Sequence, residues 1–378
     1  MKNNLQKTIM KTYWSKEYNW RRASVSRYLQ TPDDNCVINN ETYFKPPNIN
    51  NHSSNLYYDV KKNILCCCWF SGDNEGDEGC HIYISRFDLN NKMMMWSDPI
   101  KITDNKGFAD QNPIMFYFKD YYYMIHNTQV DKVGDTSAYI KLVKSVTNDF
   151  SAKEIQSCEF DNKRGQMIRC RVLVEDDRVL LPFYFIEYNN TEAYFKSGLY
   201  IIRSLDKVIE YQKVIIEGSE NLLEPCLVRV GNDCNGIKYH LYFRDQRAKY
   251  VYRSISMDGG VTWDKPEVLV LENNHSAIDV IRASNGKLVL VGNRKFDKRN
   301  FGRAPLSIYV SDDDGVNWKF IMDLDPKESE PYYVWRYGEF SYPSILEIGD
   351  YFHISYTYNR KTIKYIKILI RNILEKID

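Results

Sequence analysis

One eight-residue pattern occurs twice in the chain, as Ser256-Met257-Asp258-Gly259-Gly260-Val261-Thr262-Trp263 and as Ser311-Asp312-Asp313-Asp314-Gly315-Val316-Asn317-Trp318. Both copies read Ser-x-Asp-x-Gly-x-Thr/Asn-Trp. A short acidic side chain can hydrogen-bond a turning backbone, glycine tolerates a positive φ, and the closing tryptophan can pack its ring beneath the turn. The pattern therefore predicts a hairpin turn held by its own side chains, with the tryptophan buried. Such a turn stabilises a fold and does not by itself indicate chemistry.

Short runs rich in Ile, Val, Tyr and Phe alternate with Gly, Asn and Asp turns along almost the whole chain. These runs are residues 65–70, 81–85, 113–118, 121–126, 138–143, 178–185, 198–203, 227–230, 238–243, 250–255, 287–291, 306–310, 351–356 and 362–368. No long segment keeps a period of 3.6 residues, so we expect an all-β chain. At 378 residues the chain is long for one domain, but a single six-bladed propeller accounts for this length.

Charge and hydropathy exclude several classes of protein. The formal net charge is only +1, which gives no long-range field for nucleic acid or an anionic membrane. Residues 1–20 lack the apolar core of a signal peptide, and no stretch approaches the roughly 18 apolar residues of a membrane span. We therefore expect a cytoplasmic protein that binds neither nucleic acid nor membrane.

The cysteines indicate packing rather than chemistry. There are nine of them, an odd number without metal-type spacing, and three form Cys66-Cys67-Cys68 inside an apolar run. Neighbouring residues of a strand face opposite ways, so this triplet is badly placed to pair with itself. We expect reduced, mostly buried cysteines and no metal site.

From His52 onward the chain resembles the sialidase-like branch of the Asp-box superfamily, the BNR-repeat proteins, in which the eight-residue pattern is the Asp-box. The matching phrases, in chain order, are His52-Ser53-Ser54, Trp69-Phe70-Ser71-Gly72, Gln111-Asn112-Pro113, Glu224-Pro225-Cys226, Phe243-Arg244-Asp245, Gly302-Arg303-Ala304-Pro305 and Phe340-Ser341-Tyr342-Pro343-Ser344. The resemblance implies six four-stranded antiparallel blades over residues 46–378. Residues 1–45 fit the pattern poorly, and we expect them to form an N-terminal arm or a segment that closes the ring.

The resemblance also implies a mechanism. Sialidases use a tyrosine nucleophile beside a glutamate, an acid/base carboxyl group, and three arginines that bind the carboxylate of the sugar. That carboxylate sits on the anomeric carbon and repels an anionic nucleophile, whereas a neutral tyrosine deprotonated by a nearby glutamate avoids most of this repulsion. By position, Tyr342 matches the nucleophile and Glu224 its base. Either could instead be a structural residue, Tyr342 in the core and Glu224 at a turn.

Other family positions map onto further residues of the chain. Arg244 and Arg303 match arginines that bind the sugar carboxylate, for which the planar guanidinium is suited. Glu75, in an acidic loop, lies where the family places its acid/base group. Asp110 and Asn112 fall on the inner edge of the next blade, where they could contact sugar hydroxyl groups. For each of these residues a solvated turn or a structural ion pair is the alternative.

Blade one departs from the family. Where sialidases carry an aromatic-Arg-Ile-Pro phrase that supplies the first carboxylate-binding arginine, this chain has His52-Ser53-Ser54. Histidine carries a charge only when protonated, and its ordinary pKa of about 6.5 makes that a mildly acidic condition. We therefore expect His52 to contact the carboxylate, and to do so better as the pH falls.

Two functions remain open. The first is an exo-glycosidase, without metal or other cofactor, that releases a terminal sialic acid or a related 2-keto-3-deoxy sugar acid from a glycan or small glycoside. The second is a catalytically inactive propeller that binds glycan or protein at its centre. The joint presence of Glu224, Arg244, Arg303 and Tyr342 favours the enzyme, and His52 favours the alternative. We expect a monomer.

Overall fold

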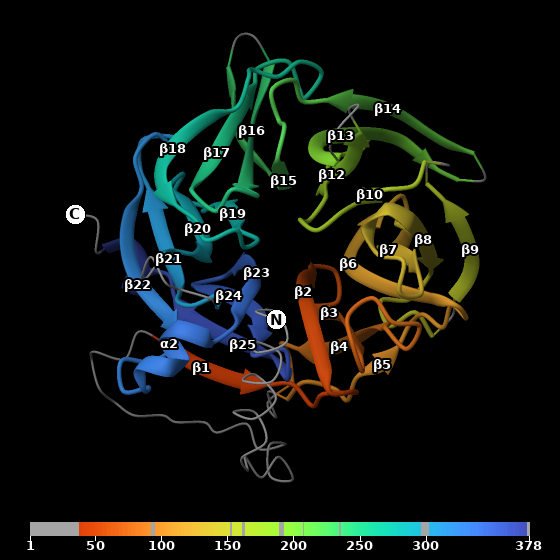
Figure 1. The fold of residues 1–378 in the computed structure, drawn as a ribbon, viewed down its shortest axis with the longest axis horizontal. Coiled ribbons are helices and arrows are strands. Elements are labelled where there is room, and N and C mark those ends of the chain that lie inside the picture. Colours follow the sequence, from red (N-terminus) through yellow and green to blue (C-terminus); the bar gives the residue numbers. More distant parts are fainter. Residues whose placement is uncertain are drawn as a thin grey trace.

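The computed structural model of the chain describes residues 38–91, 95–151, 153–160, 163–188, 193–206, 208–233, 236–295 and 302–375. Within these ranges six antiparallel sheets are arranged around a central axis (Figure 1). The chain is therefore an all-β, six-bladed propeller, as the pattern of short apolar runs and Asp-boxes predicted.

The strands follow one another blade by blade, from the axis outward. Blade one contains β2 (Asn50–Asp59), β3 (Ile64–Gly72), β4 (His81–Asp88) and β5 (Ile100–Lys101). Blade two contains β6 (Phe108–Phe118), β7 (Tyr121–Val130), β8 (Tyr139–Ser145) and β9 (Lys153–Glu159). In blade three the inner position is split between β10 (Gln166–Met167) and β11 (Leu173–Val174), which both pair with β12 (Val179–Tyr188), followed by β13 (Ala193–Leu205) and β14 (Ile209–Ile215).

The second half of the ring repeats this order. Blade four contains β15 (Leu222–Asp233), β16 (Gly236–Asp245), β17 (Tyr250–Ser256) and β18 (Glu267–Glu272). Blade five contains β19 (Asp279–Arg282), β20 (Leu288–Asn293), β21 (Leu306–Ser311) and β22 (Lys319–Asp325). Blade six contains β23 (Phe340–Ile348), β24 (Tyr351–Tyr358) and β25 (Thr362–Leu369).

The outermost strand of blade six comes from the other end of the chain. It is β1 (Ile38–Tyr43), which runs antiparallel to β25. A buried lysine on β25 holds the two together, since Lys364 Nζ lies 2.8 Å from Asp325 Oδ2 and 3.1 Å from Glu41 Oε2. Residues 1–37, most of the predicted N-terminal segment, lie outside the described residues.

Helical segments in the described ranges are short. They are η2 (Asp135–Ser137), α2 (Tyr332–Tyr337) and α3 (Arg371–Leu374). None of the helices in this part of the chain is long and apolar enough to cross a membrane.

The core is divided among the interfaces between blades. Each pair of neighbouring blades encloses its own cluster of buried apolar side chains. In the cluster between blades two and three, for example, Phe183 and Tyr200 of blade three stack with ring centroids 4.2 Å apart, and both rings are fully buried. Burial of a large apolar side chain contributes about 1.5–3 kcal/mol, so these six clusters hold the ring together. In the described ranges six cysteines are free and buried, and burial raises the pKa of the Cys68 thiol to about 12. They are Cys66, Cys67, Cys68, Cys80, Cys170 and Cys226.

Both Asp-boxes form the predicted turn, between the third and fourth strands of their blades. In the first, Asp258 accepts hydrogen bonds from the amides of Val261 and Thr262, and Ser256 Oγ accepts one from the amide of Gly260. The second copy repeats these contacts through Asp313 and Ser311. Because strands in a blade alternate in direction, these turns lie at the end of the blade opposite to the start of its inner strand.

The tryptophans of these turns are half-buried, whereas the sequence pattern predicted buried rings. Trp263 packs against the cluster between blades three and four, and Trp318 against that between blades four and five. Each indole Nε1 donates to the carbonyl of the Asp-box glycine, Gly260 at 2.9 Å and Gly315 at 3.2 Å. This bond keeps one edge of the ring at the surface.

We expect Trp263→Ala and Trp318→Ala each to lower the free energy of unfolding by about 2–4 kcal/mol, below the full cost for a buried tryptophan because part of each ring is exposed. Denaturant unfolding measures the loss. Val261→Ala and Val316→Ala are matched controls in the same turns, since both valines are exposed, and should change stability by less than about 0.5 kcal/mol. Equal effects of the tryptophan and valine variants would contradict the proposed role of the rings.

Candidate active site

The same irregularity interrupts the inner strand of four blades. Pairing with the second strand shifts register after His52, Gln111, Leu223 and Ser341. The next residue in each case has a positive φ, and these residues are Ser53, Asn112, Glu224 and Tyr342. A β-bulge leaves a residue out of the ladder and re-aims its side chain, and strained backbone of this kind is found at functional sites. The bulges therefore explain how Glu224 and Tyr342, from blades four and six, come to face each other.

Tyr342, Glu224 and Arg244 form a continuous buried chain. Tyr342 Oη donates to Glu224 Oε1 at 2.9 Å, and Glu224 Oε2 lies 2.9 Å from Arg244 Nε. All three residues are more than nine-tenths buried. The predicted proximity of Tyr342 and Glu224 is therefore present, while their catalytic roles remain predictions.

Arginines surround the ring of Tyr342. The guanidinium carbons of Arg169, Arg303 and Arg244 lie 5.0, 5.1 and 5.7 Å from the ring centroid. Burial raises the pKa of the Tyr342 phenol, Arg244 and Arg303 oppose this rise, and the charge of Glu224 adds to it. The Tyr342 phenol is therefore neutral at ordinary pH, and it lies next to the Glu224 carboxyl group and several arginines.

Arg169 was not recognised in the sequence. It lies between β10 and β11, the two parts of the inner strand of blade three, and is buried, and its Nη2 donates to the carbonyl of Pro343 at 3.0 Å. Two residues later Arg171 contacts Asp279 and the carbonyl of Ile345. The two arginines thus reach from blade three to blade six and hold the backbone that follows Tyr342. The alternation Arg169-Cys170-Arg171 within an apolar region was the available signal.

His52 does not act as the expected charged substitute for arginine. It is buried, its Nδ1 lies 2.8 Å from Thr357 Oγ1, and its ring centroid is 4.1 Å from that of Tyr342. Burial lowers the pKa of His52 well below its ordinary value, and the charges of nearby arginines, Arg360 first, lower it further. The imidazole is therefore neutral in mild acid, and the expectation that it becomes charged there was wrong.

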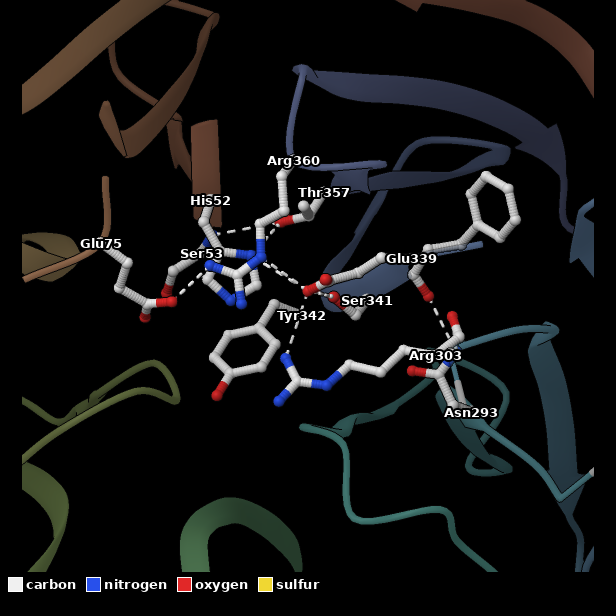
Figure 2. Close-up of polar contacts among 12 residues, drawn as sticks. His52, Ser53, Glu75, Asn293, Arg303, Glu339, Ser341, Tyr342, Thr357 and Arg360 are labelled. Carbon is white, nitrogen blue, oxygen red and sulfur yellow. Dashed lines mark hydrogen bonds and ion pairs between the residues drawn. The ribbon is translucent and has the colours of Figure 1, made fainter. Parts of the chain in front are cut away.

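Figure 2 shows what occupies the space beside His52. The guanidinium of Arg360 lies between two carboxylates, with Nε 2.7 Å from Glu339 Oε1 and Nη1 2.5 Å from Glu75 Oε2. Glu339 also contacts Arg303 Nη1 at 3.3 Å. Neither Arg360 nor Glu339 was singled out in the sequence, although Glu339 lies three residues before Tyr342.

The remaining predicted residues divide into two groups. Glu75, on the loop between β3 and β4, is partly exposed and joins the site through Arg360. Asn112 Oδ1 accepts from Ser53 Oγ at 2.7 Å, which links two of the bulges. Asp110, in contrast, is fully buried, and its oxygens accept hydrogen bonds from Asn105 and Thr128. Asp110 therefore has the surroundings of a structural carboxylate within blade two, and its expected contact with substrate is not supported.

A further carboxyl group lies within electrostatic reach of this cluster. Asp135 lies on η2, between β7 and β8, and is exposed at the surface. Partial desolvation raises its pKa, with the charges of Glu75 and Glu224 adding to the rise and Arg244 opposing it. A carboxyl group that holds its proton more firmly than usual is suited to donate it. In the described ranges, no three His, Cys, Asp or Glu side chains gather as a metal-binding group.

The fold and these residues define a class of protein, a six-bladed propeller whose inner-strand bulges bring a buried tyrosine, a glutamate and several arginines together at its axis. Residues 63–354 match the family described as the BNR repeat-like domain. The chain belongs to this family. A search of curated protein sequences found no match.

Solved structures with this fold include several sialidases. The chain is similar to the Hadza microbial sialidase Hz136, with a TM-score of 0.66 and 13% identity over 86% of this chain and 67% of that one. For Trypanosoma rangeli sialidase the TM-score is 0.65 and the identity 9%, over 88% of this chain but only 57% of the longer trypanosomal protein. For the intramolecular trans-sialidase from Ruminococcus gnavus the values are 0.59 and 10%, over 88% and 95% of the two chains. At these identities the similarity establishes the fold.

Proposed function

We propose that the protein is an exo-glycosidase that releases a terminal sugar carrying a carboxylate at or next to its anomeric carbon, such as a sialic acid or a related 2-keto-3-deoxy sugar acid. The observation that carries the proposal is the 2.9 Å hydrogen bond from Tyr342 Oη to Glu224 Oε1, buried among arginines. A nucleophile activated by an adjacent base, beside cations that would attract a carboxylate, is the arrangement that this chemistry needs.

In the proposed reaction, Tyr342 Oη bonds to the anomeric carbon while the bond from that carbon to the leaving oxygen breaks. The phenol proton passes to Glu224, and the leaving oxygen takes a proton from a carboxyl group. Glu75 is the predicted donor and Asp135 a second candidate, because its pKa is raised. Water then displaces Tyr342 from the carbon and gives a proton to the donor carboxylate, while Glu224 returns its proton to Tyr342.

The arginines have separate tasks in this proposal. Arg244 is buried and ion-paired with Glu224, so it holds in place the carboxylate that would accept the phenol proton. Arg169 holds the Pro343 carbonyl and thereby the bulge of Tyr342. Arg303 is more exposed, which leaves it accessible to the carboxylate of a ligand.

A panel of fluorogenic glycosides tests the proposal. We expect release from N-acetylneuraminic acid or 3-deoxy-2-ulosonic acid glycosides, and no release from a neutral galactoside, whose anomeric carbon carries no carboxylate. Calorimetric binding of free N-acetylneuraminic acid, measured alongside, separates the two functions left open by the sequence. Binding without release would favour the catalytically inactive propeller, for which the neutral His52 in place of a blade-one arginine is the supporting observation. Neither binding nor release of any acidic sugar would contradict both.

A further inference from the structure

Two arginines from different blades share one carboxylate oxygen. Arg303 Nη1 lies 3.3 Å and Arg360 Nε 2.7 Å from the same atom, Glu339 Oε1 (Figure 2). Arg303 precedes β21 of blade five, whereas Arg360 lies in the turn between β24 and β25 of blade six. Since both groups lie within 3.3 Å of one oxygen, a single carboxylate of a ligand could reach both of them.

Arg303 and Arg360 are more exposed to solvent than the other two arginines of the site, and each has N–H groups that are not hydrogen-bonded to any described residue. The side chains of Arg303 and Arg360 are about one quarter exposed, at 26% and 25%. Within the described part of the chain, Nη2 of each has no hydrogen-bond partner. Arg169 and Arg244 are buried and bonded to Pro343 and Glu224. The first pair is therefore available to a ligand, and the second pair supports the nucleophile.

The backbone explains why Arg360 can occupy the space beside His52. Its carbonyl accepts a hydrogen bond from the amide of Asn51, the residue before His52, at 2.6 Å. The neighbouring Asn359 is bonded in both directions to Glu339, with its amide donating to the carbonyl and its Oδ1 accepting from the amide. The turn of blade six is thus attached to the start of β2, and the guanidinium of Arg360 lies next to the imidazole (Figure 2).

We propose that Arg360 replaces the missing blade-one arginine and binds the carboxylate of the sugar together with Arg303, opposite Glu339. The inference rests on the proposed function, because it assumes that the ligand carries a carboxylate. Arg360 is already paired with two carboxylates, Glu339 through Nε and Glu75 through Nη1. The ligand carboxylate must therefore compete with Glu75 for this guanidinium.

Calorimetry tests the proposal in a Tyr342→Phe background, where turnover does not interfere. The probes are the methyl α-glycoside of N-acetylneuraminic acid and its neutral methyl ester. We expect the acid to bind at least about tenfold more tightly than the ester, since charge-assisted hydrogen bonds are the stronger ones. Arg360→Gln should weaken binding of the acid by about ten- to hundredfold and leave binding of the ester within about threefold. Arg360→Lys should keep part of the preference, because it keeps the charge but loses the two-pronged donor.

The ion pair between Arg360 and Glu75 gives a second test, in which the substitution should strengthen binding of the acid instead of weakening it. Glu75→Gln frees Arg360, so binding of the acid should become a few times tighter, and this gain should vanish when Arg360→Gln is also present. Arg203→Gln is the matched control, since Arg203 is an exposed arginine of β13 paired with Asp177 of the same blade and, in the described part of the chain, makes no contact with the site residues, and it should change nothing. Circular dichroism checks that each variant folds.

The outcomes separate the inference from the proposed function. A preference for the acid that survives Arg360→Gln unchanged would overturn the role of Arg360 and leave the proposed function standing. Absence of any preference for the acid in the parent protein would overturn both. If Glu75→Gln strengthened binding of the acid equally with Arg360 present and with Arg360→Gln, Glu75 would be competing with the ligand for a different cation. That result would contradict the inference.

Discussion

Tyr342→Phe should reduce sugar release by about a thousandfold or more, with little change in ligand affinity or stability. The substitution removes only the phenol oxygen, which is the atom that would form the bond to the anomeric carbon and that now donates to Glu224. Initial rates on the best substrate of the panel, together with calorimetry and denaturant unfolding, measure the three quantities.

The chain offers a close control for this substitution. Tyr122 is also buried and also donates to a carboxylate, Asp59 Oδ2 at 2.6 Å, but it lies on the second strand of blade two. Tyr122→Phe should cost stability through the lost hydrogen bond and leave turnover per folded molecule unchanged. If Tyr342→Phe kept release within tenfold of the parent, Tyr342 would not be the nucleophile.

Glu224→Gln should impair release to a similar degree, because the amide retains the shape of the side chain but cannot take the phenol proton. It also leaves the buried Arg244 without its counterion, so the fraction of folded protein must be measured with each rate.

Acid should destabilise the protein between pH 7 and pH 5, before most carboxylates are protonated. The pKa values of all six histidines are lowered, chiefly by burial. Burial lowers the pKa of His353 to about 3, and that of His240 to about 4, with nearby Arg253 and Lys238 acting in the same direction and Asp314 opposing them. Both rings are almost fully buried.

The direction of the effect follows from proton binding. An unfolded histidine takes up a proton near pH 6.5, whereas folded His353 does so only near pH 3, so protons favour the unfolded chain as the pH falls below 6.5. The contribution of His353 to stability is therefore complete above about pH 6.5 and decreases by about 2 kcal/mol on going from pH 7 to pH 5. His240 should contribute a similar amount.

Urea unfolding at pH 7 and pH 5 measures this loss. In His353→Gln, which retains a hydrogen-bonding side chain near Tyr365, the difference in stability between the two pH values should shrink by about 2 kcal/mol. An unchanged difference would mean that His353 titrates normally in the folded protein.

The sequence predicted the middle strands of the blades better than their edges. The predicted runs 121–126 and 250–255 fall in β7 and β17, which are buried between neighbouring blades and therefore rich in apolar residues. Outer strands such as β14 and β18 face solvent on one side and were not among the predicted runs, although about half or more of their residues are apolar. The inner strands β2 and β23 carry the polar residues of the site, which interrupt the apolar pattern.

What the sequence determined by itself was local. The hydrogen bonds that shape an Asp-box turn lie within its eight residues, so its pattern predicts a turn wherever it occurs, and two copies identify the propeller. Tyr342, Glu224 and Arg244 could be selected because each belongs to a short phrase of fixed order, although no spacing could show that Tyr342 and Glu224, 118 positions apart, are hydrogen-bonded.

Only the tertiary structure decided what surrounds these residues. Arg360 meets Glu75 across 285 positions, and Arg169 meets Pro343 across 174, because closing the ring brings blade six beside blade one and opposite blade three. The state of His52 also depends on this closure, because burial among the blades and the charges of nearby arginines keep it neutral. The state of Asp110 depends instead on its contacts with Asn105 and Thr128 in the same part of the chain. Burial and the charges of distant residues set the chemistry of a side chain, and neither is encoded in the residues next to it in the sequence.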